Sequence, residues 1–451
     1  MTNQTSSRAE TDITNTPISD SIINVFRHRR ITTSSDIVHK VIETYATRVL
    51  LTGVGLLTTI AIARFLGPSG RGLYAVAATT GLLGVQFGNL GLHTSNVYVV
   101  SQDPRSLAPL VGNSLIVSFS VGAFIAGILA LLLTLTPSLI SISGTLLFLA
   151  VAWIPFGLAY LLLQNLLLGV NDVRGYNSID VGNKVVLLLL IVGLVASGQA
   201  GVTTFLGAAL ASIVTSCIWA WRRLRTRFAG NAAVSLPLFR RSVRYAAKAY
   251  FAALFAFLVL RADLFMVQHM LGSLQAGYYS VAASMADYVS ILSVVVGVIL
   301  FPRLSAMTEL KAKLRLTRQA VWGTVGLLLP MLAVASLLAK PAVAILFGSA
   351  FLPAAFAFIL LMPGMFFLGI NTVAVQFLNS IGYPSSVVVI WGLCAFLNIG
   401  LNLWVIPHRG ILGASVVSSV SYFLAFFLVL LVIRRAAIQA SKDLTLTATA
   451  S

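Results

Sequence analysis

Long apolar stretches dominate this chain and leave few folds open to it. A helix needs about 20 apolar residues to cross a bilayer about 30 Å thick. Hydrophobic residues make up 58% of the 451 residues and charged residues only 9%, which is more apolar surface than a soluble core can cover. The sequence therefore predicts an all-α integral membrane protein with about 12 transmembrane helices. The predicted spans are 43–66, 73–99, 109–135, 143–169, 180–197, 201–221, 243–270, 277–301, 319–339, 352–380, 386–406 and 411–433.

A thirteen-residue signature occurs twice, 205 positions apart, and seven positions match without a gap. The first copy covers residues 66–78 and the second covers residues 271–283. Each copy follows the first predicted span of its half, and both of those spans run in the same direction. Internal repeats in membrane chains are typical of transporters with a substrate path between two lobes. We therefore expect two six-helix lobes related by a parallel repeat.

The basic residues predict the orientation in the membrane. Most of the 30 Lys and Arg residues fall on one side of the predicted bundle, as the positive-inside rule requires of a cytoplasmic face. This distribution places both termini in the cytoplasm. It also explains the net charge of +18 by contact with anionic lipids and gives no reason to invoke nucleic acid. No cleavable signal peptide is visible in the polar N-terminal residues.

The same spans predict the domain organisation. Residues 1–40 form a disordered cytoplasmic tail, residues 41–221 and 243–433 form the two lobes, and residues 434–451 form a cytoplasmic C-terminal tail. Residues 222–242 form a basic cytoplasmic linker between the lobes.

Charges inside apolar spans are costly, so each needs a partner or a hydrated cavity. Arg261 lies well inside its span and is two residues from Asp263, on a different side of a helix. It either lines a cavity or forms an interhelical ion pair. Arg48 and Lys248 lie near the inner ends of their spans, where each either snorkels to the inner interface or faces a cavity. Asp263 and Asp287 are candidates for ion coupling, and an ordinary interhelical hydrogen bond is the alternative.

A polar stripe lies along the predicted span 73–99. Its members are spaced by 3, 4 and 3 residues, which places them on one face of a continuous helix. They are Gln86, Asn89, His93 and Asn96. Such a stripe either forms interhelical hydrogen bonds or lines a hydrophilic path for a sugar. Neither the histidines nor the two cysteines have metal-ligand spacing, so no metal and no cofactor are expected.

Several motifs are similar to those of a known family. They are Ala63-Arg64-Phe65-Leu66-Gly67-Pro68-Ser69-Gly70-Arg71-Gly72-Leu73-Tyr74, Arg261-Ala262-Asp263, Ala276-Gly277-Tyr278-Tyr279-Ser280, Leu300-Phe301-Pro302-Arg303-Leu304-Ser305, Leu346-Phe347-Gly348 and Phe377-Leu378-Asn379. Over residues 41–433 the chain resembles bacterial polysaccharide transporters, the lipid-linked oligosaccharide flippases of the multidrug/oligosaccharidyl-lipid/polysaccharide exporter superfamily.

The resemblance implies a flippase of the bacterial inner membrane. Its substrate would be a polyprenyl-diphosphate-linked oligosaccharide for cell-surface polysaccharide or exopolysaccharide synthesis, carried to the outer leaflet by alternating access. Other polysaccharide assembly proteins would be partners. Cationic side chains attract the diphosphate in related flippases, and Arg48, Lys248 and Arg261 are the positions that would take this role here.

Two other classes of function compete with this interpretation. A cation-coupled drug antiporter of the same superfamily would favour buried carboxylates, whereas basic groups outnumber carboxylates in these spans. A membrane glycosyltransferase or ligase would need a large outer loop with catalytic groups, and the predicted outer loops are short and nearly uncharged. The sequence therefore favours a transporter over an enzyme.

Overall fold

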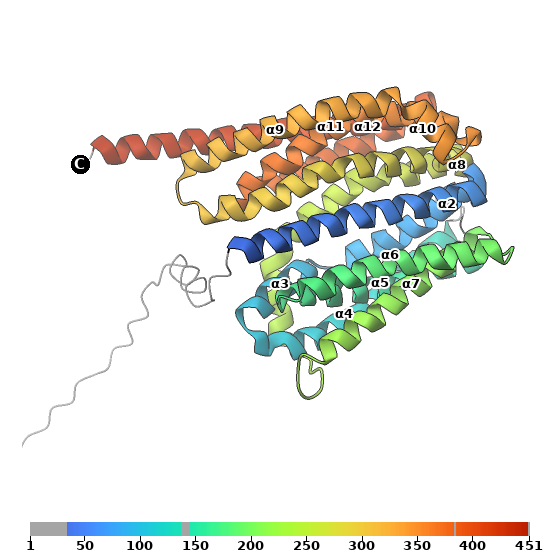
Figure 1. Cartoon of the computed structure of the whole chain (residues 1–451), viewed down its shortest axis with the longest axis horizontal. Coiled ribbons are helices and arrows are strands. Elements are labelled where there is room, and N and C mark those ends of the chain that lie inside the picture. The colour runs from blue at the N-terminus through green and yellow to red at the C-terminus, as the bar shows by residue number, and fades with distance from the viewer. Residues whose placement is uncertain (1–33, 137–141, 143, 383–384, 450–451) are drawn as a thin grey trace, which may run out of the picture. The chain divides into compact units, whose positions relative to one another are not determined.

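The computed structural model describes the backbone of residues 34–136, 142, 144–382 and 385–449, with side chains between residues 50 and 438. Within these ranges the chain is helical and contains no strand (Figure 1). The α-helices are α2 (Ser34–Gly88), α3 (Leu92–Gln102), α4 (Leu107–Leu135), α5 (Gly144–Gly169), α6 (Val173–Ala196), α7 (Val202–Arg225), α8 (Leu236–Ala306), α9 (Leu310–Leu337), α10 (Ala339–Leu346), α11 (Leu352–Ser380) and α12 (Ser385–Thr449). Two short 3-10 helices are η1 (Pro104–Ser106) and η2 (Ser349–Phe351).

Nine helical stretches in the described part of the chain are long and apolar enough to cross a membrane. Three of them, in α2, α8 and α12, each contain one glycine with non-helical backbone angles. These three stretches span 39, 71 and 54 residues, well beyond the ~20 residues of a single crossing. Dividing each at its glycine yields the twelve segments expected from the sequence. Twelve crossings of a bilayer stay a prediction.

The bends in α2 and α8 are equivalent. Gly67 has φ 66° and ψ 179°, and Gly272, 205 positions later, has φ 82° and ψ 179°. Only glycine adopts this backbone region without severe steric strain. The sequence predicted six-residue connectors at 67–72 and 271–276, and that prediction is wrong. The chain reverses at one glycine in each copy and resumes helical structure directly afterwards.

Other helix ends also differ from the predicted spans. The non-helical connector between α7 and α8 is Thr226–Ser235, which is shorter than the predicted linker 222–242. Helix α12 continues to Thr449, so the predicted C-terminal tail from 434 is helical over most of its length. Helix α2 begins at Ser34, within the predicted tail 1–40, and residues 1–33 lie outside the described residues.

Helix α2 contributes to two hydrophobic cores. Ala63 and Val76 pack with α8, α9, α11 and α12, whereas Ile62 and Ala77 pack with α4, α5, α6 and α7. In both arms of α2, neighbouring residues belong to different cores, so α2 packs against two groups of helices. The division into lobes 41–221 and 243–433 stays a prediction.

A ring contact and several hydrogen bonds join the two groups of helices at positions far apart in the sequence. The rings of Tyr98 in α3 and Tyr245 in α8 stack with centroids 4.3 Å apart. The Tyr250 hydroxyl donates to the Phe87 carbonyl at 3.0 Å. Arg64 Nε donates to the Leu346 carbonyl at 2.8 Å, at the C-terminus of α10, where a cation is favoured. These contacts set the register of α2, α3 and α8, which carry the candidate site.

Candidate functional site

An ion pair joins the two arms of α8. Arg261 Nη2 lies 2.7 Å from Asp287 Oδ2, across the bend at Gly272. The reversal at Gly272 brings residues 26 positions apart to face each other. The two side chains are 30% and 40% exposed, so the pair is partly accessible. Of the two alternatives in the sequence, the structure supplies an interhelical ion pair, while a role for Arg261 in lining a cavity stays a prediction.

Asp263 has a different set of partners from Arg261. Its carboxylate accepts hydrogen bonds from the Tyr279 hydroxyl at 2.5 Å, the Ser418 hydroxyl at 2.9 Å and the Leu264 amide at 2.8 Å. Asp263 and Tyr279 are both buried. A buried carboxylate needs such donors, because an unpaired one is very costly. Tyr279 is the tyrosine of the second signature copy that corresponds to Tyr74 of the first. The second copy therefore supplies one of the hydrogen-bond donors to this buried carboxylate.

Arg71 is a basic residue between the predicted spans 43–66 and 73–99. In the structure it lies in α2 after the bend and is buried, with Nη2 3.2 Å from Ser284 Oγ. Its guanidinium carbon lies 5.7 Å from the centre of the Tyr74 ring. Arg71 Nε has no hydrogen-bond partner among the described residues. One signal for a helical position was present, since Pro68 directly after Gly67 is typical of the first residue of a helix.

Three residues on one face of α8 form the contacts with Arg71, Arg261 and Thr59. Asp287 lies three residues after Ser284 and Tyr288 lies four residues after it, so the three residues share a helix face. Ser284 is contacted by Arg71, Asp287 by Arg261, and the Tyr288 hydroxyl lies 3.0 Å from the Thr59 hydroxyl. We call Ser284, Asp287 and Tyr288 the serine–aspartate face. Cationic groups from α2 and from the first arm of α8 therefore meet at this face.

The predicted polar stripe does not follow one continuous helix. Helix α2 ends at Gly88 and α3 begins at Leu92, because Leu90 (φ 50°) and Gly91 (φ 74°) adopt left-handed angles. The prediction of an unbroken helix over 73–99 is therefore wrong. Left-handed residues stop the ladder of helical hydrogen bonds and reorient the chain.

The stripe residues have separate environments. Asn89 is buried, and its Oδ1 lies 2.9 Å from His93 Nδ1. Asn96 is buried, and its Nδ2 donates to Ser114 of α4 at 3.0 Å. Gln86 and His93 are half-buried. Asn89 and Asn96 thus make hydrogen bonds that hold α3 in place, while a role for the four residues in lining a substrate path stays a prediction.

One other predicted cationic position, Lys248, makes no contact with the serine–aspartate face. Lys248 is exposed on α8, thirteen residues before Arg261, which is about 20 Å along a helix at 1.5 Å per residue. The Arg48 side chain lies outside the described side chains. No group of three or more His, Cys, Asp or Glu side chains with the geometry of a metal site occurs within the described residues.

The family of the chain follows from comparison with known proteins. The sequence profile of the polysaccharide biosynthesis protein family matches residues 61–356, which is more than half of the chain. The chain belongs to the polysaccharide biosynthesis protein family. The matched range contains Arg71, Arg261, Asp263 and Asp287, and Arg48 lies before it.

Solved structures of transporters share the fold of this family member. The inward-facing multidrug resistance MATE family transporter of the MOP superfamily matches with a TM-score of 0.68 and 14% identity, over 86% of this chain and 96% of that chain. The lipid II flippase MurJ in its inward closed conformation matches with a TM-score of 0.66 and 15% identity, over 88% and 87% of the two chains. The fold is therefore that of multi-pass MOP superfamily transporters.

A curated relative matches a shorter stretch. An uncharacterized membrane protein of Methanocaldococcus jannaschii is 29% identical over 152 residues, which are 33% of this chain. The match spans 30% of that relative's length. The two solved structures that share this fold are a multidrug transporter and a lipid flippase, so the fold is the one expected from the sequence.

Proposed function

We propose that this protein is a flippase that moves a polyprenyl-diphosphate-linked oligosaccharide from the inner to the outer leaflet of a bacterial inner membrane, with both termini in the cytoplasm. The observation that carries the proposal is the approach of Arg71 and Arg261 to the serine–aspartate face from two different helices. Membership of a polysaccharide biosynthesis family and the fold shared with a lipid II flippase support it.

The chemistry of the diphosphate explains why arginines would be used. A diphosphate cannot enter hydrocarbon without groups that replace its water shell. Arginine supplies a planar set of donors that binds two phosphate oxygens at once. Arg71 retains an unpartnered Nε donor, and Arg261 is held by a partly exposed carboxylate. An incoming diphosphate would compete with Asp287 for Arg261, so that binding the substrate releases the contact between the two arms of α8.

The proposal gives the other predicted residues supporting roles. In the proposal, Arg48 and Lys248 attract the headgroup near the inner surface, and Gln86 and His93 contact the sugar while Asn89 and Asn96 hold the broken helix. The prenyl chain stays in lipid, and the headgroup passes between lobes 41–221 and 243–433 as they open alternately to each side. No covalent bond has to break during this cycle.

Translocation in liposomes tests the proposal. Purified protein would be reconstituted in liposomes with a fluorescent prenyl-diphosphate oligosaccharide. A quencher added outside the liposomes would report the fraction of the labelled lipid in the outer leaflet over time. Arg71→Gln and Arg261→Gln should each slow translocation about tenfold or more, since a charge-assisted hydrogen bond contributes about 1.5–3 kcal/mol. Arg303→Gln removes an exposed charge away from the face and serves as the matched control. Equal rates in all three variants would refute the role of the face.

A cation-coupled antiporter for drugs is the second candidate. It is favoured by the buried carboxylate of Asp263 with its Tyr279 and Ser418 donors, because such an acid could exchange a proton or sodium ion for substrate. The same liposomes would be tested for uptake of a cationic dye driven by a proton or sodium gradient. Dye uptake that is lost in Asp263→Asn, without any lipid-sugar translocation, would establish the antiporter and overturn the flippase.

A further inference from the structure

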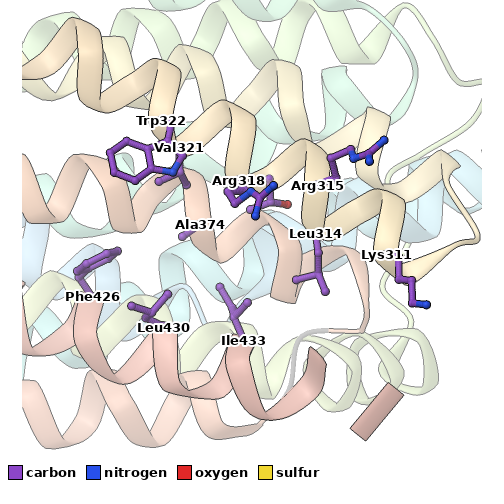
Figure 2. Close-up of a pocket in the computed structure, with 11 residues that line it drawn as sticks. Lys311, Leu314, Arg315, Arg318, Val321, Trp322, Ala374, Phe426, Leu430 and Ile433 are labelled. Carbon is purple, nitrogen blue, oxygen red and sulfur yellow. The ribbon is translucent and has the colours of Figure 1, made fainter. Parts of the chain in front are cut away.

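A groove with a volume of about 530 Å³ lies between α9, α11 and the end of α12, away from the serine–aspartate face. Figure 2 shows Leu314 of α9 pointing towards the row of apolar side chains on α12. Ala374 of α11 lies between these two walls. The walls are apolar, and they are formed by Leu314, Val321, Trp322, Ala374, Phe426, Leu430 and Ile433. This volume falls within the usual range of small-molecule sites.

Three cations border one end of the groove. Lys311, Arg315 and Arg318 line it at spacings of four and three residues, so they lie along one face of α9 over about 10 Å. All three side chains are exposed. None of them forms a hydrogen bond or ion pair with another described residue. Three adjacent positive charges repel one another unless an anion lies between them.

A fourth basic residue in the same turn shows the contrast. Lys313 is buried, and its Nζ donates to the carbonyl of Ser380 at 3.2 Å, at the end of α11. Its charge is used to hold α9 against α11. The other three cations line the groove and form no such contact with the described residues, so they can bind a ligand outside the chain.

The combination of walls and rim defines the chemistry of that ligand. Apolar walls fit a hydrocarbon chain, and the cationic rim fits a phosphate group. Trp322 lies one turn beyond Arg318 and is 67% exposed, as is typical of tryptophans at the level of lipid headgroups. Basic residues at the ends of membrane helices mark the cytoplasmic side, where anionic lipids are concentrated.

We propose that this groove binds one anionic phospholipid of the inner leaflet. Its phosphate contacts Lys311, Arg315 and Arg318, and one acyl chain lies along Phe426, Leu430 and Ile433. The bound lipid connects α9 to the end of α12 and so stabilises their packing. This site is independent of the proposed transport activity, because none of its residues belongs to the serine–aspartate face.

Native mass spectrometry of the full chain tests the proposal. Delipidated protein in detergent would be titrated with phosphatidylglycerol and, separately, with phosphatidylcholine of the same acyl chains. The protein should retain one phosphatidylglycerol in clear preference to phosphatidylcholine. The triple variant Lys311→Gln, Arg315→Gln, Arg318→Gln should bind phosphatidylglycerol at least about tenfold more weakly, because each basic residue near the headgroup contributes to the attraction.

A second triple variant controls for the loss of charge, and a further variant tests the apolar wall without changing any charge. The triple variant Arg105→Gln, Arg222→Gln, Arg303→Gln loses the same charge at exposed positions elsewhere and should retain the preference. Leu430→Trp keeps all charges and fills the groove at a position that is 47% exposed, so it should weaken lipid binding without unfolding the protein.

Three outcomes would overturn the proposal. The first is equal retention of the two phospholipids by the unaltered protein. The second is unchanged binding of phosphatidylglycerol by the Lys311, Arg315 and Arg318 variant or by Leu430→Trp. The third is preferential retention of a prenyl phosphate over phosphatidylglycerol, which would assign the groove to the path of the transported lipid.

Discussion

Gly72 and Gly277 occupy equivalent places in one reciprocal contact between α2 and α8. A Cβ atom on Gly72 would collide with the carbonyl oxygen of Ser273, and one on Gly277 would collide with the carbonyl oxygen of Pro68. Pro68 and Ser273 are 205 positions apart, as are the two glycines. Each copy of the signature thus supplies one glycine and one carbonyl to the other copy. This is the geometry of an interface with two-fold symmetry.

Replacing either glycine should separate the two copies. In Gly72→Ala or Gly277→Ala the added methyl group meets backbone, which cannot move aside as a flexible side chain can. We expect a loss of about 1–3 kcal/mol of stability, as in other overpacked sites. Thermal unfolding in detergent measures it. Gly323→Ala in α9 has open space around the new methyl group and should be neutral or slightly stabilising. Equal melting temperatures for all three variants would contradict the close contact.

The pair between Arg261 and Asp287 should affect stability little and ligand binding much. Its partial exposure limits its contribution to about 1 kcal/mol or less. Asp287→Asn frees Arg261 of its counter-charge and should tighten binding of a prenyl diphosphate, whereas Arg261→Gln should weaken it about tenfold or more. Titration of the purified variants with a fluorescent prenyl diphosphate measures both effects. A double-mutant cycle isolates their interaction. Identical affinities for Asp287→Asn and Arg261→Gln would show that neither group faces the ligand.

The contact between Arg71 and Ser284 should matter for stability because Arg71 is buried. Ser284→Ala removes the acceptor of Arg71 Nη2 and should destabilise the protein by about 1–3 kcal/mol, the usual cost of an unsatisfied buried donor. Ser290→Ala is the matched control, since the Ser290 hydroxyl donates to the Asp287 carbonyl within its own helix. Chemical unfolding monitored by tryptophan fluorescence compares the two variants. A larger loss in Ser290→Ala would argue against a special role for the Arg71 contact.

Asp172, which lies between α5 and α6, should make the stability of the protein depend on pH. The hydrogen bonds from Arg223, at 2.6 and 2.9 Å, lower the pKa of this carboxyl below 3.8, with further contributions from the Gly175 amide and Arg227. A lowered pKa means that the ionised carboxylate stabilises the fold at every pH above 3.8. That contribution is lost as the pH falls from 3.8 through the lower pKa of the folded state.

The measurement compares two neighbouring arginines. Arg223→Gln removes the main partner of Asp172 and should lower the melting temperature at pH 7 while reducing its dependence on pH below 3.8. Arg222→Gln removes an exposed charge that does not contact Asp172 and should retain the pH dependence of the unaltered protein. The same acid sensitivity in both variants would mean that another carboxyl controls it.

Several structural features could be predicted from local sequence, and others could not. The apolar spans predicted the membrane helices, because span length and apolarity are properties of neighbouring residues. The predicted spans 43–66 and 73–99 leave the Gly67-Pro68 pair in a connector outside the helices. The structure instead uses Gly67 as a single bend and Pro68 as a helix start, which places Arg71 inside a helix. The helical spacing of the polar residues from Gln86 to Asn96 likewise predicted one continuous helix, whereas the structure has a break at Leu90 and Gly91.

By itself, the sequence determined the class of the molecule: a helical membrane protein with a duplicated signature, basic connectors and isolated charges inside apolar spans. These properties follow from composition, spacing and repetition along the chain. Only the tertiary structure decided which side chains meet. Arg261 pairs with Asp287 and Arg71 with Ser284 because the bends at Gly67 and Gly272 and the packing of α2 against α8 bring together positions 26 and 213 residues apart. Contacts of this kind depend on the packing of whole helices, and no local pattern specifies them.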